Sequence, residues 1–123
     1  MKSTNLICVF GSLRKGLWNN HLLAKSNFLG ETETEPVFTM LNWGGFPGLL
    51  HHGHGKIKIE VYEIESEETW QNLDRLEGYP NFYNRMIIET EFGFAWIYYN
   101  PLTDNNKNSD IVESGDWVKF KNE

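Results

Sequence analysis

The most restrictive pattern in the sequence lies at residues 56–64, KIKIEVYEI, where apolar and polar residues alternate. Ile57, Ile59 and Val61 occupy every second position of this segment. Because successive side chains of a β-strand point to opposite faces, the spacing predicts a strand with one buried face. The fold is therefore expected to contain a β-sheet.

Four further segments have the composition of strands. Residues 6–10 (LICVF) and 37–41 (VFTML) are short apolar runs, which are typical of buried strands. Residues 85–90 and 94–99 are rich in apolar residues and are separated by a turn at residues 92–93. This arrangement predicts a β-hairpin.

Two segments predict helices. Residues 19–28 begin with an asparagine and predict a short helix. Residues 66–77 begin with a serine, a residue type that caps helices, and end before Gly78. Residues 43–50 (WGGFPGLL) predict a loop with bulky apolar side chains, and residues 51–55 (HHGHG) predict a turn. Strands outnumber helices, so an α+β fold is expected.

Length, charge and cysteine content narrow the class of protein. The 123 residues fit one domain, residues 1–123. Asp and Glu (17) outnumber Lys and Arg (11), and the net charge of −6 argues against binding nucleic acid through its phosphates. The single cysteine, Cys8, excludes an internal disulfide and a four-cysteine zinc site. No run of about 18 apolar residues is present to span a membrane, so a protein of the reducing cytoplasm is expected.

Glu77 is the residue whose position is hardest to explain as ordinary surface. The predicted helix has its apolar side chains at Trp70, Leu73 and Leu76, and Glu77 follows Leu73 by four residues. It therefore falls on the same inward stripe. Burial and the negative end of the helix dipole both raise the pKa of a carboxyl group, toward the range of a general base or acid. The alternative is that Glu77 lies at a frayed helix end and turns to water.

A second segment that indicates a functional site is the turn GSLRKG, residues 11–16, which follows the first predicted strand. A strand that ends in glycine can leave successive backbone N–H groups facing one space, where they bind an anion. Ser12 adds a hydroxyl group, and Arg14 and Lys15 add positive charge. The alternative is an ordinary strand-to-helix connection with exposed basic side chains. The segment contains neither a P-loop nor a dinucleotide-binding motif.

Together, these segments resemble a known family. Residues 9–23 (VFGSLRKGLWNNHLL) resemble the N-terminal signature of the γ-glutamylcyclotransferase-like family, which includes γ-glutamylamine cyclotransferases and AIG2-like proteins. Residues 73–85 (LDRLEGYPNFYNR) resemble its second signature. Residues 94–100 (FAWIYYN) and 113–120 (ESGDWVKF) resemble the strand that follows and the Gly-Asp-Trp ending of small bacterial members. The resemblance covers nearly the whole chain.

The resemblance implies both a fold and an activity. The expected fold is a small mixed β-barrel with flanking helices and a cavity between the two signatures. Family members release 5-oxoproline from γ-glutamyl compounds without metal or cofactor, so a small γ-glutamyl molecule is the expected partner. The family's catalytic glutamate falls on Glu77. Its substrate-binding positions fall on Phe10, Gly11, Ser12, Leu13 and Tyr83.

Other interpretations stay open at this point. Phe10 stands where the family usually has tyrosine, which leaves room for a non-catalytic protein that binds a small ligand or regulates a partner. His51, His52 and His54 are candidate metal ligands, although no acidic or cysteine partner lies at a usual spacing. The sequence indicates neither the leaving amine nor the oligomeric state.

Overall fold

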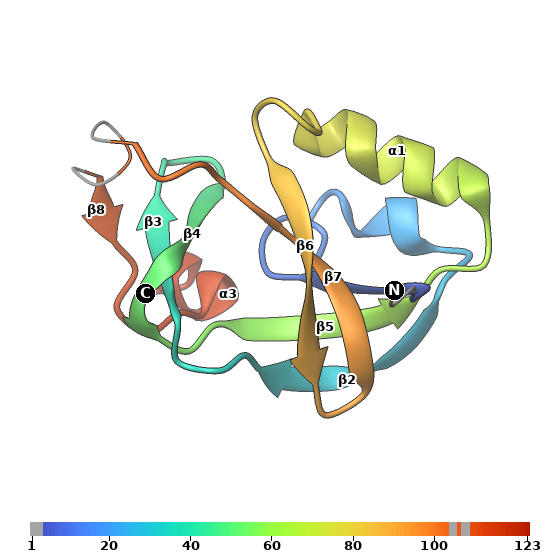
Figure 1. Cartoon of the computed structure of the whole chain (residues 1–123), viewed down its shortest axis with the longest axis horizontal. Coiled ribbons are helices and arrows are strands. Elements are labelled where there is room, and N and C mark those ends of the chain that lie inside the picture. Colours follow the sequence, from blue (N-terminus) through green and yellow to red (C-terminus); the bar gives the residue numbers. More distant parts are fainter. Residues whose placement is uncertain (1–3, 104–105, 107–108) are drawn as a thin grey trace.

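Most strands belong to one five-stranded sheet. The computed structural model describes residues 4–103, 106 and 109–123. The strand order in this sheet is β2-β5-β1-β7-β6, and β1 pairs antiparallel with β5 and parallel with β7 (Figure 1). Its strands are β1 (Leu6–Val9), β2 (Asn27–Glu33), β5 (Lys58–Glu63), β6 (Asn84–Thr90) and β7 (Gly93–Tyr99).

The other elements of the described residues are a small sheet and the helical segments η1, α1 and α3. The small sheet has the order β4-β3-β8, with β3 at Phe38–Asn42, β4 at Pro47–Gly55 and β8 at Asp110–Ile111. The helical segments are a 3₁₀ turn η1 (Asn20–Leu23), α1 (Glu67–Glu77) and α3 (Trp117–Lys121). The expectation of an α+β fold is confirmed.

The strands of the described residues form two sheets and no closed barrel, which corrects the barrel part of the expectation. The two sheets meet at Asn100, just after β7. Its backbone N–H donates to the carbonyl oxygen of Leu49 at 2.7 Å, and its side-chain oxygen accepts from the N–H of Leu49 at 2.8 Å. Asn100 is buried, and its backbone and side chain together link the two sheets. A closed barrel would need a continuous ladder of strand-to-strand hydrogen bonds at this place.

The alternating segment forms β5, but both of its faces are covered. Ile59 and Val61 are fully buried, as the pattern predicts, and Glu60 and Tyr62 are also buried. The hydroxyl of Tyr62 donates to the carboxylate of Glu60 and accepts from the side-chain amide of Asn20. The second face of the strand is therefore covered by the chain that follows β1, and its polar groups are hydrogen-bonded.

Two local predictions differ from the structure. Residues 19–28 form only the short turn η1 before β2 begins at Asn27. Residues 47–55, expected as loop and turn, form β4 by pairing with β3, with Leu41 opposite Gly48. The glycines of β4 have weak strand propensity, so pairing with β3 decides the conformation. The hairpin of β6 and β7 is confirmed.

Candidate active site

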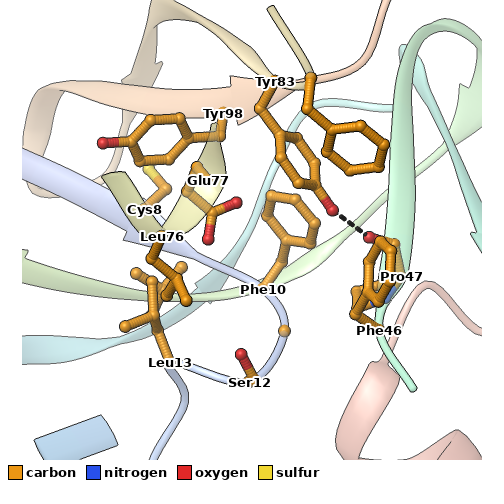
Figure 2. Close-up of a pocket in the computed structure, with 13 residues that line it drawn as sticks. Cys8, Phe10, Ser12, Leu13, Phe46, Pro47, Leu76, Glu77, Tyr83 and Tyr98 are labelled. Carbon is orange, nitrogen blue, oxygen red and sulfur yellow. Dashed lines mark hydrogen bonds between the residues drawn. The ribbon is translucent and has the colours of Figure 1, made fainter. Parts of the chain in front are cut away.

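A cavity of about 190 Å³ lies between β1, the end of α1 and the start of β4 (Figure 2). All six residues that the sequence singled out as site residues line it. Seven other residues complete the wall. Two of them, Phe46 and Pro47, belong to residues 43–50, which the sequence also suggests as the segment that excludes water, and the other five were not assigned to the site. The lining consists of Cys8, Val9, Phe10, Gly11, Ser12, Leu13, Phe46, Pro47, Leu76, Glu77, Phe82, Tyr83 and Tyr98.

Glu77 is the last residue of α1, and its carboxylate points into the cavity. Local signals fix this helix: the Ser66 hydroxyl accepts from the N–H of Thr69 at 3.2 Å, and Gly78 ends the helix with a left-handed φ of 64°. Leu73 is fully buried on the same stripe. Burial raises the pKa of the Glu77 carboxyl from 4.5 to about 7. The interpretation that Glu77 turns to bulk water does not hold.

The turn after β1 faces Glu77 across the cavity. In Figure 2 the Ser12 hydroxyl and the Glu77 carboxylate point into the cavity from opposite sides. The carbonyl oxygens of the turn are occupied: Gly11 accepts from the N–H of Arg14, and Ser12 from the N–H of Asn19. Within the described part of the chain, the N–H groups of Gly11, Ser12 and Leu13 donate no hydrogen bond. They are available to an anionic or carbonyl oxygen.

Two asparagines hold this turn in place, and sequence reasoning missed their role. The side-chain amide of Asn19 donates to the Ser12 hydroxyl at 2.8 Å, which leaves the hydroxyl hydrogen free to donate. The side-chain amide of Asn20 donates to the carbonyl oxygen of Leu13 at 2.7 Å. Both asparagines lie in residues 9–23, which resemble the first family signature. Their position in this signature is the sequence feature that could have indicated their role.

Arg14 and Lys15 do not bring their charge to the cavity, contrary to expectation. The Arg14 guanidinium is buried and pairs with Glu60 at 2.9 Å and Asp116 at 2.8 Å. The Lys15 ammonium lies 3.6 Å from the centre of the Phe28 ring. Neither side chain lines the cavity, so Glu77 is the one charged residue of the lining within the part of the chain that the structure describes.

Tyrosines close the cavity on the side of the β6–β7 hairpin. The hydroxyl of Tyr83 donates to the carbonyl oxygen of Pro47 at 2.6 Å, so this ring ties the end of α1 to the start of β4. Burial, with the nearby Glu77 carboxylate, raises the pKa of Tyr83. The hydroxyl of Tyr98 donates to Asp74 at 2.7 Å, on the preceding turn of α1. Phe10 is buried and presents an apolar ring where the family usually has a phenol.

The histidines expected as alternative metal ligands lie elsewhere. His51, His52 and His54 are exposed on β4, and none of them lines this cavity. Across residues 4–103, 106 and 109–123, no three His, Cys, Asp or Glu side chains gather as a shared metal ion requires. None of the helices in these residues is long and apolar enough to cross a membrane.

Comparison with known proteins decides the family. The family model described as "Gamma-glutamyl cyclotransferase, AIG2-like" matches residues 7–119. The chain belongs to this family. A Vibrio cholerae protein provisionally named gamma-glutamylcyclotransferase is 40% identical over 115 residues, which cover 94% of this chain and 96% of that protein. The gamma-glutamylcyclotransferase family protein YtfP of Escherichia coli K12 is 34% identical over 113 residues, covering 91% and 95% of the two chains.

Solved structures of other proteins have the same fold. The Pyrococcus horikoshii protein PH0828 superposes with a TM-score of 0.79 at 28% identity, over 97% of this chain and 93% of that one. The solution structure of E. coli YtfP gives a TM-score of 0.71 at 30% identity, over 94% and 98%. A mouse AIG2-like protein, at 22% identity and a TM-score of 0.76, has the same fold over 94% and 90%.

Proposed function

We propose that this protein is a γ-glutamylcyclotransferase that releases 5-oxoproline and a free amine from a γ-glutamyl compound. One observation carries the proposal: the Glu77 carboxyl, with a pKa of about 7, shares one cavity with residues 11–13, whose backbone N–H groups donate no hydrogen bond within the described residues. A base of this pKa suits proton transfer near neutral pH. The N–H groups suit a developing oxyanion.

The first step makes a nucleophile of the substrate's own amine. The Glu77 carboxylate takes a proton from the α-ammonium group of the γ-glutamyl compound. The freed amine attacks the γ-carbonyl carbon of the same molecule, and a five-membered ring closes. The walls of the cavity hold the chain folded, which supplies proximity worth several kcal/mol. Negative charge grows on the γ-carbonyl oxygen, where the N–H groups of Gly11, Ser12 and Leu13 stabilise it.

The second step transfers the proton from Glu77 to the leaving amine. Glu77, now protonated, gives its proton to the nitrogen of the leaving amine, and the bond between that nitrogen and the γ-carbon breaks. The ring nitrogen, which still carries an extra proton, gives this proton to the Glu77 carboxylate. Glu77 then passes it to the released amine, which becomes an ammonium ion. The products are 5-oxoproline and an ammonium ion, and water is not consumed. The apolar lining, to which Phe46 and Pro47 contribute from residues 43–50, excludes water from the reaction.

The test measures 5-oxoproline released from a panel of γ-glutamyl dipeptides and γ-glutamyl amines. Glu77→Gln preserves shape but cannot shuttle protons, so we expect turnover to fall about 10²- to 10⁴-fold. Glu67→Gln, an exposed glutamate in the first turn of the same helix, is the matched control and keeps its activity. Circular dichroism checks that both variants fold. A folded Glu77→Gln protein with near-normal turnover would refute the assignment.

The pH dependence of the reaction gives an independent check. Glu77 must be ionised to accept the first proton, and its pKa is about 7. We therefore expect kcat/KM of the wild-type enzyme to fall about tenfold per pH unit below pH 7 and to level off above it. A profile that stays flat from pH 5 to 8 would contradict the role of Glu77 as base.

The other interpretation from the sequence, a non-catalytic ligand-binding protein, is an outcome of the same panel. It requires that no substrate be turned over while γ-glutamyl compounds still raise the melting temperature of the protein. We place the reaction in the cytoplasm, where the single thiol Cys8 stays reduced.

A further inference from the structure

Aromatic side chains stand at the mouth of the cavity, where they remain open to solvent. Phe46 and Phe82 line the cavity with exposed fractions of 40% and 48%. Their ring centres lie 5.8 Å apart, and Trp43 packs against both at 5.9 and 5.8 Å. We call Trp43, Phe46 and Phe82 the aromatic rim. Exposed apolar surface that continues a pocket of this kind marks a ligand contact.

The rim is built in place by residues from separate segments. The Trp43 indole N–H donates to the Ser109 hydroxyl at 2.8 Å, and its ring leaves no room for a side chain at Gly48. The carbonyl oxygen of Phe82 accepts from the side-chain amide of Asn100 at 3.2 Å. The rings are therefore held at the mouth before any ligand arrives, which reduces the entropy lost on binding.

Arg85 and Lys121 are charged residues outside the cavity lining, and each has a partner of its own. Arg85 pairs with Asp74 at 3.2 Å and lies over the Tyr79 ring. The Lys121 ammonium donates to the carbonyl oxygen of Gly44 at 3.1 Å. Glu77 is the sole charged residue of the described cavity lining, and it is required for proton transfer. Among the described residues, the cavity lining therefore offers no cation to a carboxylate on the leaving amine and no second carboxylate to an ammonium group.

We propose that the aromatic rim is the subsite for the leaving amine and selects an uncharged amine with an aromatic or large apolar group. This inference rests on the proposed function, because the γ-glutamyl end must lie between Glu77 and the turn of residues 11–13. The γ-amide nitrogen then faces the mouth, and its substituent lies against Phe46 and Phe82. Covering a phenyl group with such rings is worth about a factor of ten in binding.

Four matched substrates test the preference. γ-Glutamyl-2-phenylethylamide has the aromatic group, γ-glutamyl-ethylamide lacks the ring, γ-glutamyl-phenylalanine adds a carboxylate, and γ-glutamyl-putrescine replaces the ring with an ammonium group. We expect the phenylethylamide to exceed each of the other three about tenfold in kcat/KM. An equal or higher value for γ-glutamyl-phenylalanine or γ-glutamyl-putrescine would overturn the proposed selectivity.

Rim variants show whether these rings cause the preference. Phe82→Ala and Phe46→Ala should each lower the ratio of kcat/KM for phenylethylamide over ethylamide toward one. Both side chains are largely exposed, so the variants are expected to fold. Trp18→Ala is the matched control, because Trp18 is 79% exposed and lies outside the cavity lining. A ratio unchanged in both rim variants would overturn the subsite.

Binding to the Glu77→Gln variant separates this inference from the proposed function. Calorimetry with the same four compounds measures affinity without turnover. If the wild-type protein turns over none of them but the variant binds the phenylethylamide about tenfold more tightly, the cyclotransferase proposal fails and the subsite stands. If turnover is observed but affinity shows no preference for the aromatic compound, the subsite fails and the cyclotransferase proposal stands.

Discussion

Glu60 and Glu77 are two carboxylates enclosed by the same small fold, and they differ in their partners. Glu60, on β5, is buried with Arg14 at 2.9 Å, the N–H of Lys15 at 2.8 Å and the hydroxyl of Tyr62 at 3.2 Å. Glu77 has no such partner among the described residues, and burial alone raises its pKa. A buried carboxylate with full hydrogen bonding holds the structure together, whereas a partly buried carboxylate without partners is available for chemistry.

The two carboxylates also cooperate in space. Glu60 and Arg14 fix the turn that lies across the cavity from Glu77, so the paired carboxylate positions one wall of the cavity and the unpaired carboxylate forms another. This division predicts that variants near Glu60 lower the stability of the protein, while variants near Glu77 change its activity and the dependence of its stability on pH.

The largest expected effect on stability is that of Arg14→Gln. Removing the guanidinium leaves the buried Glu60 carboxylate without its counter-charge, which costs about 3–5 kcal/mol in the free energy of unfolding. Urea denaturation at pH 7 measures the loss. Lys15→Gln is the control, because the Lys15 side chain is exposed and its backbone bond to Glu60 is retained. A loss below about 1 kcal/mol for Arg14→Gln would remove the contrast between the two sites.

Glu77→Gln should stabilise the protein at alkaline pH. The pKa of Glu77 is raised from 4.5 to about 7 on folding, so its contribution to stability is greatest below pH 4.5 and is lost as pH rises through 7. At pH 8 the neutral glutamine avoids this loss, and we expect the variant to be more stable by about 3 kcal/mol.

Urea denaturation of both proteins from pH 4 to 8 measures this difference. It should be close to zero at pH 4, grow between pH 4.5 and 7, and stay constant above. A difference that does not change with pH would show that Glu77 titrates normally in the folded protein, and the contrast with Glu60 would then fail.

The smallest expected effect is that of Ser12→Ala. The backbone N–H groups of residues 11–13 remain in this variant, and only the hydroxyl held by Asn19 is removed. We expect kcat/KM to fall about two- to tenfold with the fold intact. Initial rates of 5-oxoproline release provide the measurement. A loss as large as that of Glu77→Gln would instead make the Ser12 side chain essential to the reaction.

The same contrast explains what the sequence could predict. Glu77 was found because its position follows from the local spacing of one helix and from a family signature. The burial of Glu60 was missed because its partner Arg14 lies 46 residues away, and alternation in a strand does not indicate which remote side chain covers the polar face. β4 was missed for a similar reason, because its pairing with β3 outweighs its glycine content.

The contact between Arg14 and Asp116 has a consequence for the order of events on the ribosome. These residues are 102 positions apart, and Asp116 also accepts from the N–H of Lys119 at the start of α3. Synthesis proceeds from the N-terminus, so the GSLRKG segment is translated long before its last partner exists. The nascent chain therefore cannot complete the ion pairs of this turn until translation has passed residue 116, and a ribosome that stalls earlier would hold a chain whose Arg14 lacks one of its partners.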